Sequence, residues 1–325
     1  MNSKIINWGI IGAGKIAATF ATDLNEMADA KLYAIASRDL DKAKEFGLQF
    51  HTNVAYGNYE ELVDDPNIDA IYIATPHSFH KTHTLLCLNH KKPVLCEKPF
   101  AMNLGEVNEM IESSKQNNTL LMEALWTAFL PHFQYVQDLI DQSHFGNVLK
   151  LEADFGFHPQ YDQNSRLFDK SVGGGSLLDI GIYPIFAALW TLGQPNSIEA
   201  NARFFDTGAD SECKMIFHYD CCQAVLKSTL LKETKTEAVF TCEKGTIKIN
   251  GRFHEPSTVT LIDKHGHSEL KTFDYKTIGY NYEIEHFNQL IRNGKTESDL
   301  MTFERSRELI SKLDQVRELI GLQYT

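Results

Sequence analysis

The chain has 325 residues, of which 43% are hydrophobic and 23% charged, and its formal net charge is −12. This length favours two domains over a single core. The negative charge argues against a nucleic-acid-binding protein, since such proteins use clustered Lys and Arg to displace counterions. We find no run of about 18 apolar residues that could cross a bilayer and no signal-peptide pattern. We therefore expect a cytoplasmic protein that binds neither nucleic acid nor membrane.

The first third of the chain alternates short apolar runs with helical stretches. The runs expected to form strands are INWGII, KLYAIAS, AIYIAT, PVLCEKP and TLLMEA, and helical stretches such as KIAATFATDL and LGEVNEMIESSKQN separate them. This alternation is typical of parallel strands joined by crossover helices that cover both faces of the sheet. It predicts an α/β fold in which residues 1–122 form a doubly wound, Rossmann-type dinucleotide-binding domain.

The pattern changes after about residue 146, where long alternating segments follow one another between turn residues. Among them are VLKLEADFGF, SIEANARFF, QAVLKSTLL and TVTLIDKHG, and one apolar helix, SLLDIGIYPIFAALWTLG, lies between the strands. The segments predict a large, mostly antiparallel open sheet covered by helices on one face. We therefore expect an α+β domain over residues 123–325 that binds substrate and, through an uncovered apolar sheet face, a second subunit.

A glycine-rich loop follows the first predicted strand and precedes the first predicted helix. Gly12, Gly14 and Ala17 form the pattern GxGxxA. The first glycine permits a tight turn, the second lets the backbone approach a pyrophosphate, and the small third residue lets helix and strand pack closely. Lys15 and Ile16 then begin the helix, whose N-terminal amides favour an anion. The pattern indicates a dinucleotide site; the alternative is a glycine turn that binds nothing.

The end of the second predicted strand bears on the choice between NADP and NAD. An NAD site places an acidic residue there for the ribose hydroxyls, whereas an NADP site needs a hydroxyl and a cation for the 2′-phosphate. Ser37 and Arg38 occupy this position and favour NADP. Asp39 follows one residue later, so NAD stays possible.

Two further stretches carry residues suited to proton transfer. Lys98 ends an apolar strand in LCEKPF, where it can stabilise charge on a substrate oxygen, and Glu97 beside it can orient the site. Asp179 and Tyr183 are four residues apart in LLDIGIYP, so a helix would place both on one face. A Tyr that shuttles a proton needs its pKa lowered, which a Lys ammonium such as that of Lys98 can do. The alternative is a Tyr ring packed in the core.

The motifs together resemble the glucose-fructose oxidoreductase/inositol dehydrogenase family. They occur in the family's order and run along nearly the whole chain: GIIGAGKIA, ATPHSFH, CEKPF, EALWTAFLP, GGGSLLDIGIYP and YNYEIEHFNQLIRNGKTES. The Trp of EALW and the Tyr of LLDIGIY are most similar to the branch that holds dimeric dihydrodiol dehydrogenase and NADP-dependent xylose dehydrogenases. The resemblance implies an oxidoreductase that moves hydride between nicotinamide and a secondary alcohol or carbonyl of a sugar, polyol or trans-dihydrodiol.

The resemblance also assigns roles to single residues. Lys98 matches the family's EKP lysine, Tyr183 its proton-transferring tyrosine and Asp179 the acid that binds substrate hydroxyls. Trp126 would wall the substrate pocket, and Arg166 is a further substrate-binding candidate. The substrate would lie between the two domains.

The loop ATPHSFH is expected to contact the cofactor. Thr75, Pro76 and His77 match the loop along the nicotinamide ribose, and His80 belongs to the same loop. Where the branch has WTRF this chain has Ala128, so that substrate contact is in doubt. His77, His80 and His83 are not expected to bind a metal, since a structural zinc site needs four well-placed ligands.

Two other functions stay open at this point. One is an NAD-dependent inositol or sugar dehydrogenase; the other is a non-catalytic, cofactor-binding regulator of the same fold. The presence of Lys98, Asp179 and Tyr183 together favours an enzyme. By resemblance we expect a homodimer or a tetramer.

Overall fold

The computed structural model describes residues 4–324, and the chain groups into two compact units. The first comprises Met1–Trp126 and Lys276–Arg307, and the second comprises Thr127–Tyr275 and Glu308–Thr325. The predicted boundary at residue 122 therefore lies close to the first crossing between the units. Residues 276–307, which the sequence pattern places in the second domain, group with the first unit in the structure.

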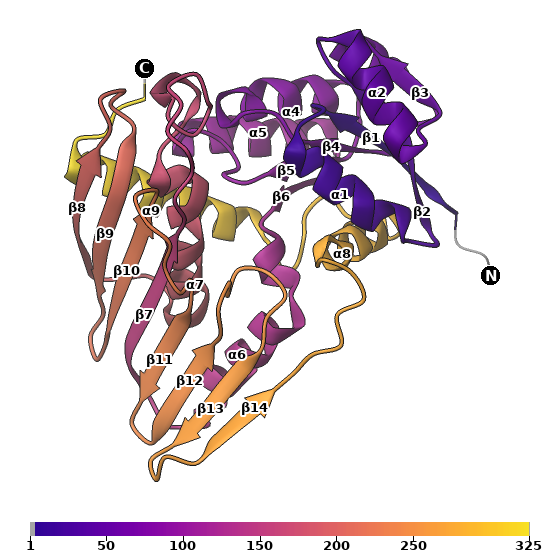
Figure 1. Ribbon diagram of the computed structural model, residues 1–325. Coiled ribbons are helices and arrows are strands. Elements are labelled where there is room, and N and C mark those ends of the chain that lie inside the picture. The colour runs from indigo at the N-terminus through magenta and orange to yellow at the C-terminus, as the bar shows by residue number, and fades with distance from the viewer. Residues whose placement is uncertain (1–3, 325) are drawn as a thin grey trace. The chain divides into compact units, whose positions relative to one another are not determined.

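The first unit is built on a six-stranded parallel sheet with the order β3-β2-β1-β4-β5-β6 (Figure 1). Its strands are β1 (Ile6–Ile11), β2 (Ala30–Ala36), β3 (Val54–Tyr56), β4 (Ala70–Ile73), β5 (Val94–Glu97) and β6 (Leu121–Ala124). The order reverses direction at β1, as it does in doubly wound nucleotide-binding sheets. The predicted Rossmann-type fold is confirmed. The short strand β3 was not predicted.

Six helices pack on this sheet in two groups. They are α1 (Lys15–Asn25), α2 (Leu40–Phe50), α3 (Tyr59–Asp64), α4 (His80–Asn89), α5 (Leu104–Asn117) and α8 (Tyr280–Arg292). Helix α1 contacts α2 and α8, whereas α4 contacts α3 and α5. The helices thus form two layers, as expected where crossovers cover both faces of a parallel sheet.

Helix α8 belongs to the first unit because α1 caps it. The carboxylate of Asp23 on α1 accepts hydrogen bonds from the backbone N–H of Tyr280, at 2.8 Å, and from the hydroxyl of Thr277, at 2.7 Å. Farther along the helix, the Trp8 indole N–H donates to Asn288, and the Trp8 and Phe287 ring centroids are 5.2 Å apart. Asp23 thus satisfies the first amides of α8, those of Tyr280 and Asn281, which have no partner within the helix.

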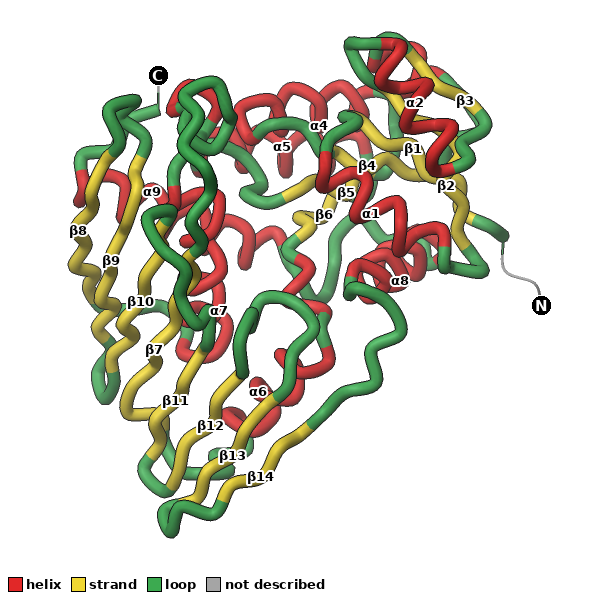
Figure 2. Tube along the Cα trace, viewed as in Figure 1, coloured by secondary structure: helices red, strands yellow, loops and turns green. Residues whose placement is uncertain are grey.

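The second unit contains an eight-stranded sheet with the order β14-β13-β12-β11-β7-β10-β9-β8 (Figure 2). All neighbouring pairs are antiparallel except β7 and β10, which are parallel. The mostly antiparallel sheet is therefore confirmed. Its strands are β7 (Val148–Gly156), β8 (Ser197–Phe204), β9 (Asp210–His218), β10 (Gln223–Thr229), β11 (Ala238–Cys242), β12 (Gly245–Ile249), β13 (Val259–Asp263) and β14 (Ser268–Lys271).

Helices cover one face of this sheet. Helix α7 (Ile182–Leu192) packs on β7 and β10, and α6 (Pro131–Asp141) packs on β12. The last helix, α9 (Phe303–Ile320), contributes its residues from Glu308 onward to this unit. Helix α6 was not predicted.

The other side of the central strands carries ion pairs. Lys150 pairs with Glu152 on β7, and Lys227 on β10 pairs with Glu212 on β9 at 2.9 Å. Lys248 on β12 pairs with Glu237 at 2.7 Å. Half-buried apolar side chains, such as those of Val225 and Val239 opposite Glu152, lie on the same face, so it is mixed in character, and its pairing with a second subunit stays a prediction.

One stretch, Lys170–Leu192, is long and apolar enough, by length and composition, to cross a membrane. The expectation that the chain has no such stretch is thus wrong. However, 89% of its most apolar window is buried inside the protein, as in the core helix of a globular unit.

Candidate active site

The glycine loop of the first unit has the geometry that a dinucleotide requires. Gly12 has φ +102°, and a Cβ there would lie 2.8 Å from the carbonyl oxygen of Ala74. Only glycine fits that backbone without strain. Gly14 stands at the N-terminus of α1, and a Cβ on it would meet no atom within 4 Å. The loop therefore leaves open space above backbone amides at a helix start, which fits a pyrophosphate.

At the end of β2, Asp39 has a structural role in the helix that follows. Asp39 is the N-cap of α2: its carboxylate accepts from the backbone N–H groups of Asp41, at 3.1 Å, and Lys42, at 3.2 Å. Ser37 Oγ in turn accepts from the Asp39 N–H. One oxygen of the carboxylate that kept NAD possible therefore serves as the cap of α2.

Arg38 is exposed and held in place by aromatic neighbours. Its guanidinium carbon lies 5.7 Å from the centroid of the Phe79 ring, and its positive charge opposes the rise that burial causes in the pKa of Tyr59. A guanidinium over a ring face gains a cation–π interaction. The arrangement leaves a fixed positive group beside the end of β2.

The loop after β4 is joined to the EKP turn by His80. The His80 ring is fully buried, with Nε2 2.9 Å from the Thr75 carbonyl oxygen and Nδ1 2.8 Å from the Pro99 carbonyl oxygen. Each ring nitrogen therefore lies within hydrogen-bond distance of a backbone carbonyl oxygen, one on each of the two loops. His80, which was predicted to bind the cofactor, thus links the loop after β4 to the EKP turn.

His77 and His83 differ in their surroundings. His77 is buried in the single-turn helix His77–Phe79 that follows Pro76. His83 has Nδ1 3.0 Å from the Thr75 hydroxyl, and burial lowers the pKa of His83 to about 4. Among residues 4–324, no group of three or more His, Cys, Asp or Glu is arranged to hold a metal ion.

The EKP turn is fixed by two buried carboxyl groups. Glu97 accepts from the backbone N–H of Lys98, at 3.1 Å, and from the phenol of Tyr72. Glu123 on β6 accepts from the backbone N–H of Phe100 at 3.1 Å, and burial raises the pKa of Glu123 to about 7. Glu97 therefore orients the turn that carries Lys98, which is half-buried and follows the end of β5.

Trp126 ends the first unit's N-terminal segment. Its ring stacks on Tyr280 with centroids 4.4 Å apart and an interplanar angle of 25°. The stack fixes the indole at the start of the short helical turn Trp126–Phe129. Ala128 in the same turn is fully buried.

In the second unit the predicted substrate residues lie together. The guanidinium of Arg166 donates to the Asp179 carboxylate at 3.1 Å, and Asp179 is 6% exposed. Tyr183 is also 6% exposed and lies on the adjoining helix α7. The structure thus brings Arg166 and Asp179 into contact and places both near the start of the Tyr183 helix.

The helix that carries these residues is not a continuous α-helix, as we had predicted. Leu177–Gly181, which includes Asp179, is a π-helical turn, and α7 begins only at Ile182. Pro184 explains the change, because it has no N–H to donate to residue 180 and its ring crowds the preceding turn. Wide π turns of this kind are frequent at functional sites.

Two residues near this helix were missed by sequence reasoning. His254, in the loop after β12, has its ring centroid 4.7 Å from that of Tyr183. Asp210, on β9, accepts from the Ser176 hydroxyl and the Leu177 N–H, each at 2.7 Å, immediately before the π turn. Both lie far from the helix in sequence and in no recognisable motif, so only the folded chain brings them there.

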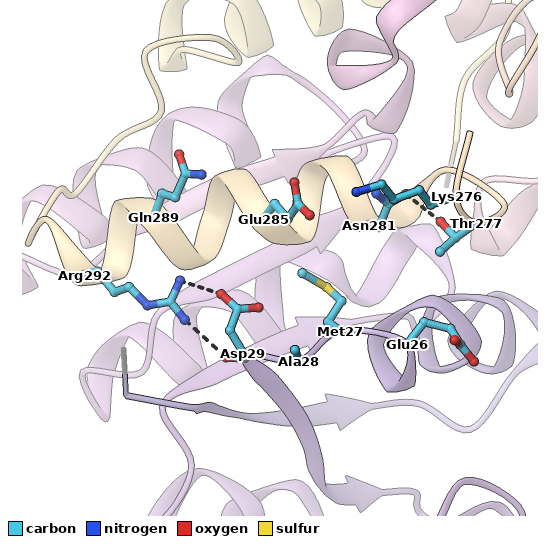
Figure 3. Close-up of a pocket in the computed structure, with 10 residues that line it drawn as sticks. All are labelled: Glu26, Met27, Ala28, Asp29, Lys276, Thr277, Asn281, Glu285, Gln289 and Arg292. Carbon is cyan, nitrogen blue, oxygen red and sulfur yellow. Dashed lines mark hydrogen bonds and ion pairs between the residues drawn. The ribbon is translucent and has the colours of Figure 1, made fainter. Parts of the chain in front are cut away.

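A separate hollow of about 410 Å³ lies along α8 in the first unit (Figure 3). Figure 3 shows Arg292 directed at Asp29, and their side chains form an ion pair of 2.7 Å. None of the predicted site residues lines this hollow. The Arg292 guanidinium also donates to the carbonyl oxygens of Lys4 and Asp29, so it ties α8 to the residues that lead into β1 and β2.

Comparison with known proteins agrees with this architecture. Residues 6–125 match an oxidoreductase family with an NAD-binding Rossmann fold, and residues 133–248 match the GFO/IDH/MocA C-terminal domain. The trans-1,2-dihydrobenzene-1,2-diol dehydrogenase of Xenopus tropicalis is 35% identical over 98% of each chain. The scyllo-inositol 2-dehydrogenase (NADP(+)) IolU of Bacillus subtilis is 33% identical over 98% of each.

A solved structure shares the fold throughout. KijD10, a 3-ketoreductase from Actinomadura kijaniata solved with NADP and TDP-benzene, superposes with a TM-score of 0.88 at 26% identity, over 98% of each chain. Fold, glycine loop and matches together define a nicotinamide-dependent oxidoreductase. The chain belongs to the GFO/IDH/MocA family. It is an NAD(P)-dependent dehydrogenase that acts on CH–OH groups, and the reading as a non-catalytic regulator is set aside.

Proposed function

We propose that this enzyme uses NADP to oxidise a secondary alcohol of a polyhydroxylated substrate, a sugar, a polyol or a trans-dihydrodiol, and catalyses the reverse reduction. The observation that carries the proposal is the pairing of Arg166 with Asp179 beside the Tyr183 helix, since a carboxylate held by a cation can accept from neighbouring hydroxyls. Relatives named for diol and inositol substrates support this class.

The chain's own residues divide the work. Bound NADP supplies the hydride acceptor at its nicotinamide ring. Tyr183 takes the proton of the reacting hydroxyl during oxidation and returns it during reduction. Lys98 stabilises the negative charge on the same oxygen. Asp179, with Arg166, binds a neighbouring hydroxyl and so fixes which carbon reacts.

Cofactor binding rests on groups of the first unit. The amides at Gly14, Lys15 and Ile16 receive the pyrophosphate, and Ser37 and Arg38 receive the 2′-phosphate. Thr75, Pro76 and His77 line the nicotinamide ribose, with His80 and Glu97 supporting this surface and the Lys98 turn. Trp126 walls the substrate pocket. We also propose a cytoplasmic enzyme that forms a homodimer or a tetramer.

The test is a kinetic comparison of Tyr183→Phe with the unmodified enzyme on trans-1,2-dihydrobenzene-1,2-diol, scyllo-inositol and D-xylose, each with NADP and with NAD. We expect kcat to fall by about 10²-fold or more, while NADPH binding, measured by fluorescence, stays unchanged. Tyr219→Phe is the matched control: Tyr219 is in the same unit, and its buried hydroxyl has no hydrogen-bond partner among the described residues. Near-normal turnover by Tyr183→Phe would refute the role of Tyr183.

A further inference from the structure

Tyr183 packs against two rings that come from other parts of the second unit. The His254 centroid lies 4.7 Å from that of Tyr183, and the Phe155 centroid lies 5.8 Å from it. His254 and Phe155 are themselves stacked, with centroids 4.1 Å apart and an interplanar angle of 29°. All three rings are buried. The phenol therefore touches both members of a stacked pair, which restricts rotation of its ring.

The backbone holds His254 firmly in this place. The buried hydroxyl of Thr127 donates to the His254 carbonyl oxygen at 2.7 Å. One residue earlier, the Phe253 carbonyl oxygen lies 2.9 Å from Nε2 of the buried His132, and the Phe253 N–H donates to Thr236. A loop residue anchored on both sides is suited to fixing a neighbouring group, because it has little freedom of its own.

The same loop also places an ion pair beside the rings. Arg252 pairs with Glu255, and the Nε2 of His254 lies 4.0 Å from the Glu255 carboxylate. The Tyr183 phenol is among the groups that raise the pKa of Arg252, after its hydrogen bond to Glu255. The ion pair thus lies in the same loop as His254, on its two sides in sequence.

We propose that His254 is a positioning residue for Tyr183: stacked with Phe155, it fixes the plane of the phenol ring and hence the direction of the hydroxyl that transfers the proton. The inference rests on the proposed function of Tyr183. It extends that function by assigning a role in orienting the Tyr183 ring to a residue of the loop between β12 and β13.

The first test is a double-mutant cycle in kcat with whichever of the three substrates above is oxidised fastest. We expect His254→Ala to lower kcat by about 10-fold or more, because small displacements of reacting groups cost on the order of 10²-fold, while KM changes by less than about 3-fold. His254→Phe keeps a ring in the stack and should restore kcat to within about 3-fold. In the Tyr183→Phe background, His254→Ala should change kcat by less than about 2-fold, since a residue acting through Tyr183 has nothing left to position.

The control for folding is Phe186→Ala. Phe186 is buried on the same helix as Tyr183 but packs on Phe133 and Trp190, so its loss should lower stability without lowering kcat as His254→Ala does. Unchanged kcat in His254→Ala would overturn the inference. So would a kcat loss in His254→Phe equal to that in His254→Ala, because the ring's packing would then not be its role.

A second readout needs no substrate. In protein labelled with 3-fluorotyrosine, the ¹⁹F resonance missing from Tyr183→Phe belongs to Tyr183. We expect this resonance to shift and change width in His254→Ala, to stay close to its original position in His254→Phe, and to be unaffected in Phe186→Ala. An unmoved resonance in His254→Ala overturns the inference whatever the activity. Full activity of Tyr183→Phe would instead overturn the proposed function, so the two failures are distinguishable.

Discussion

The hydroxyl of Ser176 donates a 2.7 Å hydrogen bond to the carboxylate of Asp210, and this contact anchors the start of the π turn that carries Asp179. The same Asp210 oxygen accepts from the Leu177 N–H, and Asp210 is fully buried. Asp210→Ala leaves both donors without this acceptor, so we expect a loss of about 1–3 kcal/mol in the free energy of unfolding and a lower kcat. Asp210→Asn keeps an acceptor and should lose less in urea titrations. Asp206→Ala, an exposed position just before β9, should match the unmodified protein in both measurements.

His132 should make the stability of the second unit depend on pH. Its ring is fully buried between the Phe253 carbonyl oxygen and the Tyr275 hydroxyl, and burial lowers the pKa of His132 from 6.5 to about 4. The unfolded chain binds a proton below pH 6.5, whereas the folded chain does so only near pH 4. The stability that neutral His132 contributes is therefore complete above pH 6.5 and is lost as the pH falls toward 4.

The measurement is urea unfolding of the unmodified protein and His132→Gln across this pH range. We expect the advantage of the unmodified protein to shrink by up to about 1.4 kcal/mol for each pH unit. His265→Gln, on the exposed turn after β13, should run parallel to the unmodified protein. A difference between the unmodified protein and His132→Gln that stays constant from pH 6.5 to 4 would contradict the argument.

The fold could be predicted where local pattern and tertiary environment agree. The buried strands β1, β4, β5 and β6 of the parallel sheet are mostly apolar runs, and all of them were expected. Strand β3 has three half-buried residues and too little pattern to recognise. Helix α8 packs in the first unit through its hydrogen bonds to Asp23 and Trp8. These contacts join residues near opposite ends of the chain, so local periodicity could not predict them.

The candidate site divides in the same way. The glycine loop and the placement of Asp179 and Tyr183 on one helix could be predicted, because each depends only on residues close together in the sequence. The π turn was not, although Pro184 gave a hint that the helix would be irregular. His254 was invisible as a neighbour of Tyr183, since a loop between two strands reaches the ring only after the sheet has formed.

Asp39 offers a direct test of the helix-cap role against a role in binding the ribose. Because its carboxylate accepts from the Asp41 and Lys42 amides, we expect Asp39→Ala to lower the free energy of unfolding by about 1 kcal/mol. Asp39→Asn keeps a capping oxygen and should be nearly neutral. Neither variant should weaken NADH binding in a fluorescence titration. A selective loss of NADH affinity in Asp39→Ala would show that the carboxylate serves the ribose after all.

Arg38 should determine the preference for NADPH over NADH. Its guanidinium is exposed and lies over the Phe79 ring, near Tyr59, so its positive charge is accessible to a phosphate. A charge-assisted hydrogen bond to a phosphate contributes about 1.5–3 kcal/mol, so we expect Arg38→Ala to weaken NADPH binding by roughly 10- to 100-fold. NADH affinity should change little, because NADH has no 2′-phosphate. Phe79→Leu removes only the ring beneath the guanidinium and should cost about 2- to 5-fold for NADPH. Parallel fluorescence titrations with the two cofactors measure both effects, and equal losses for NADPH and NADH in Arg38→Ala would mean that Arg38 shapes the loop without contacting the phosphate.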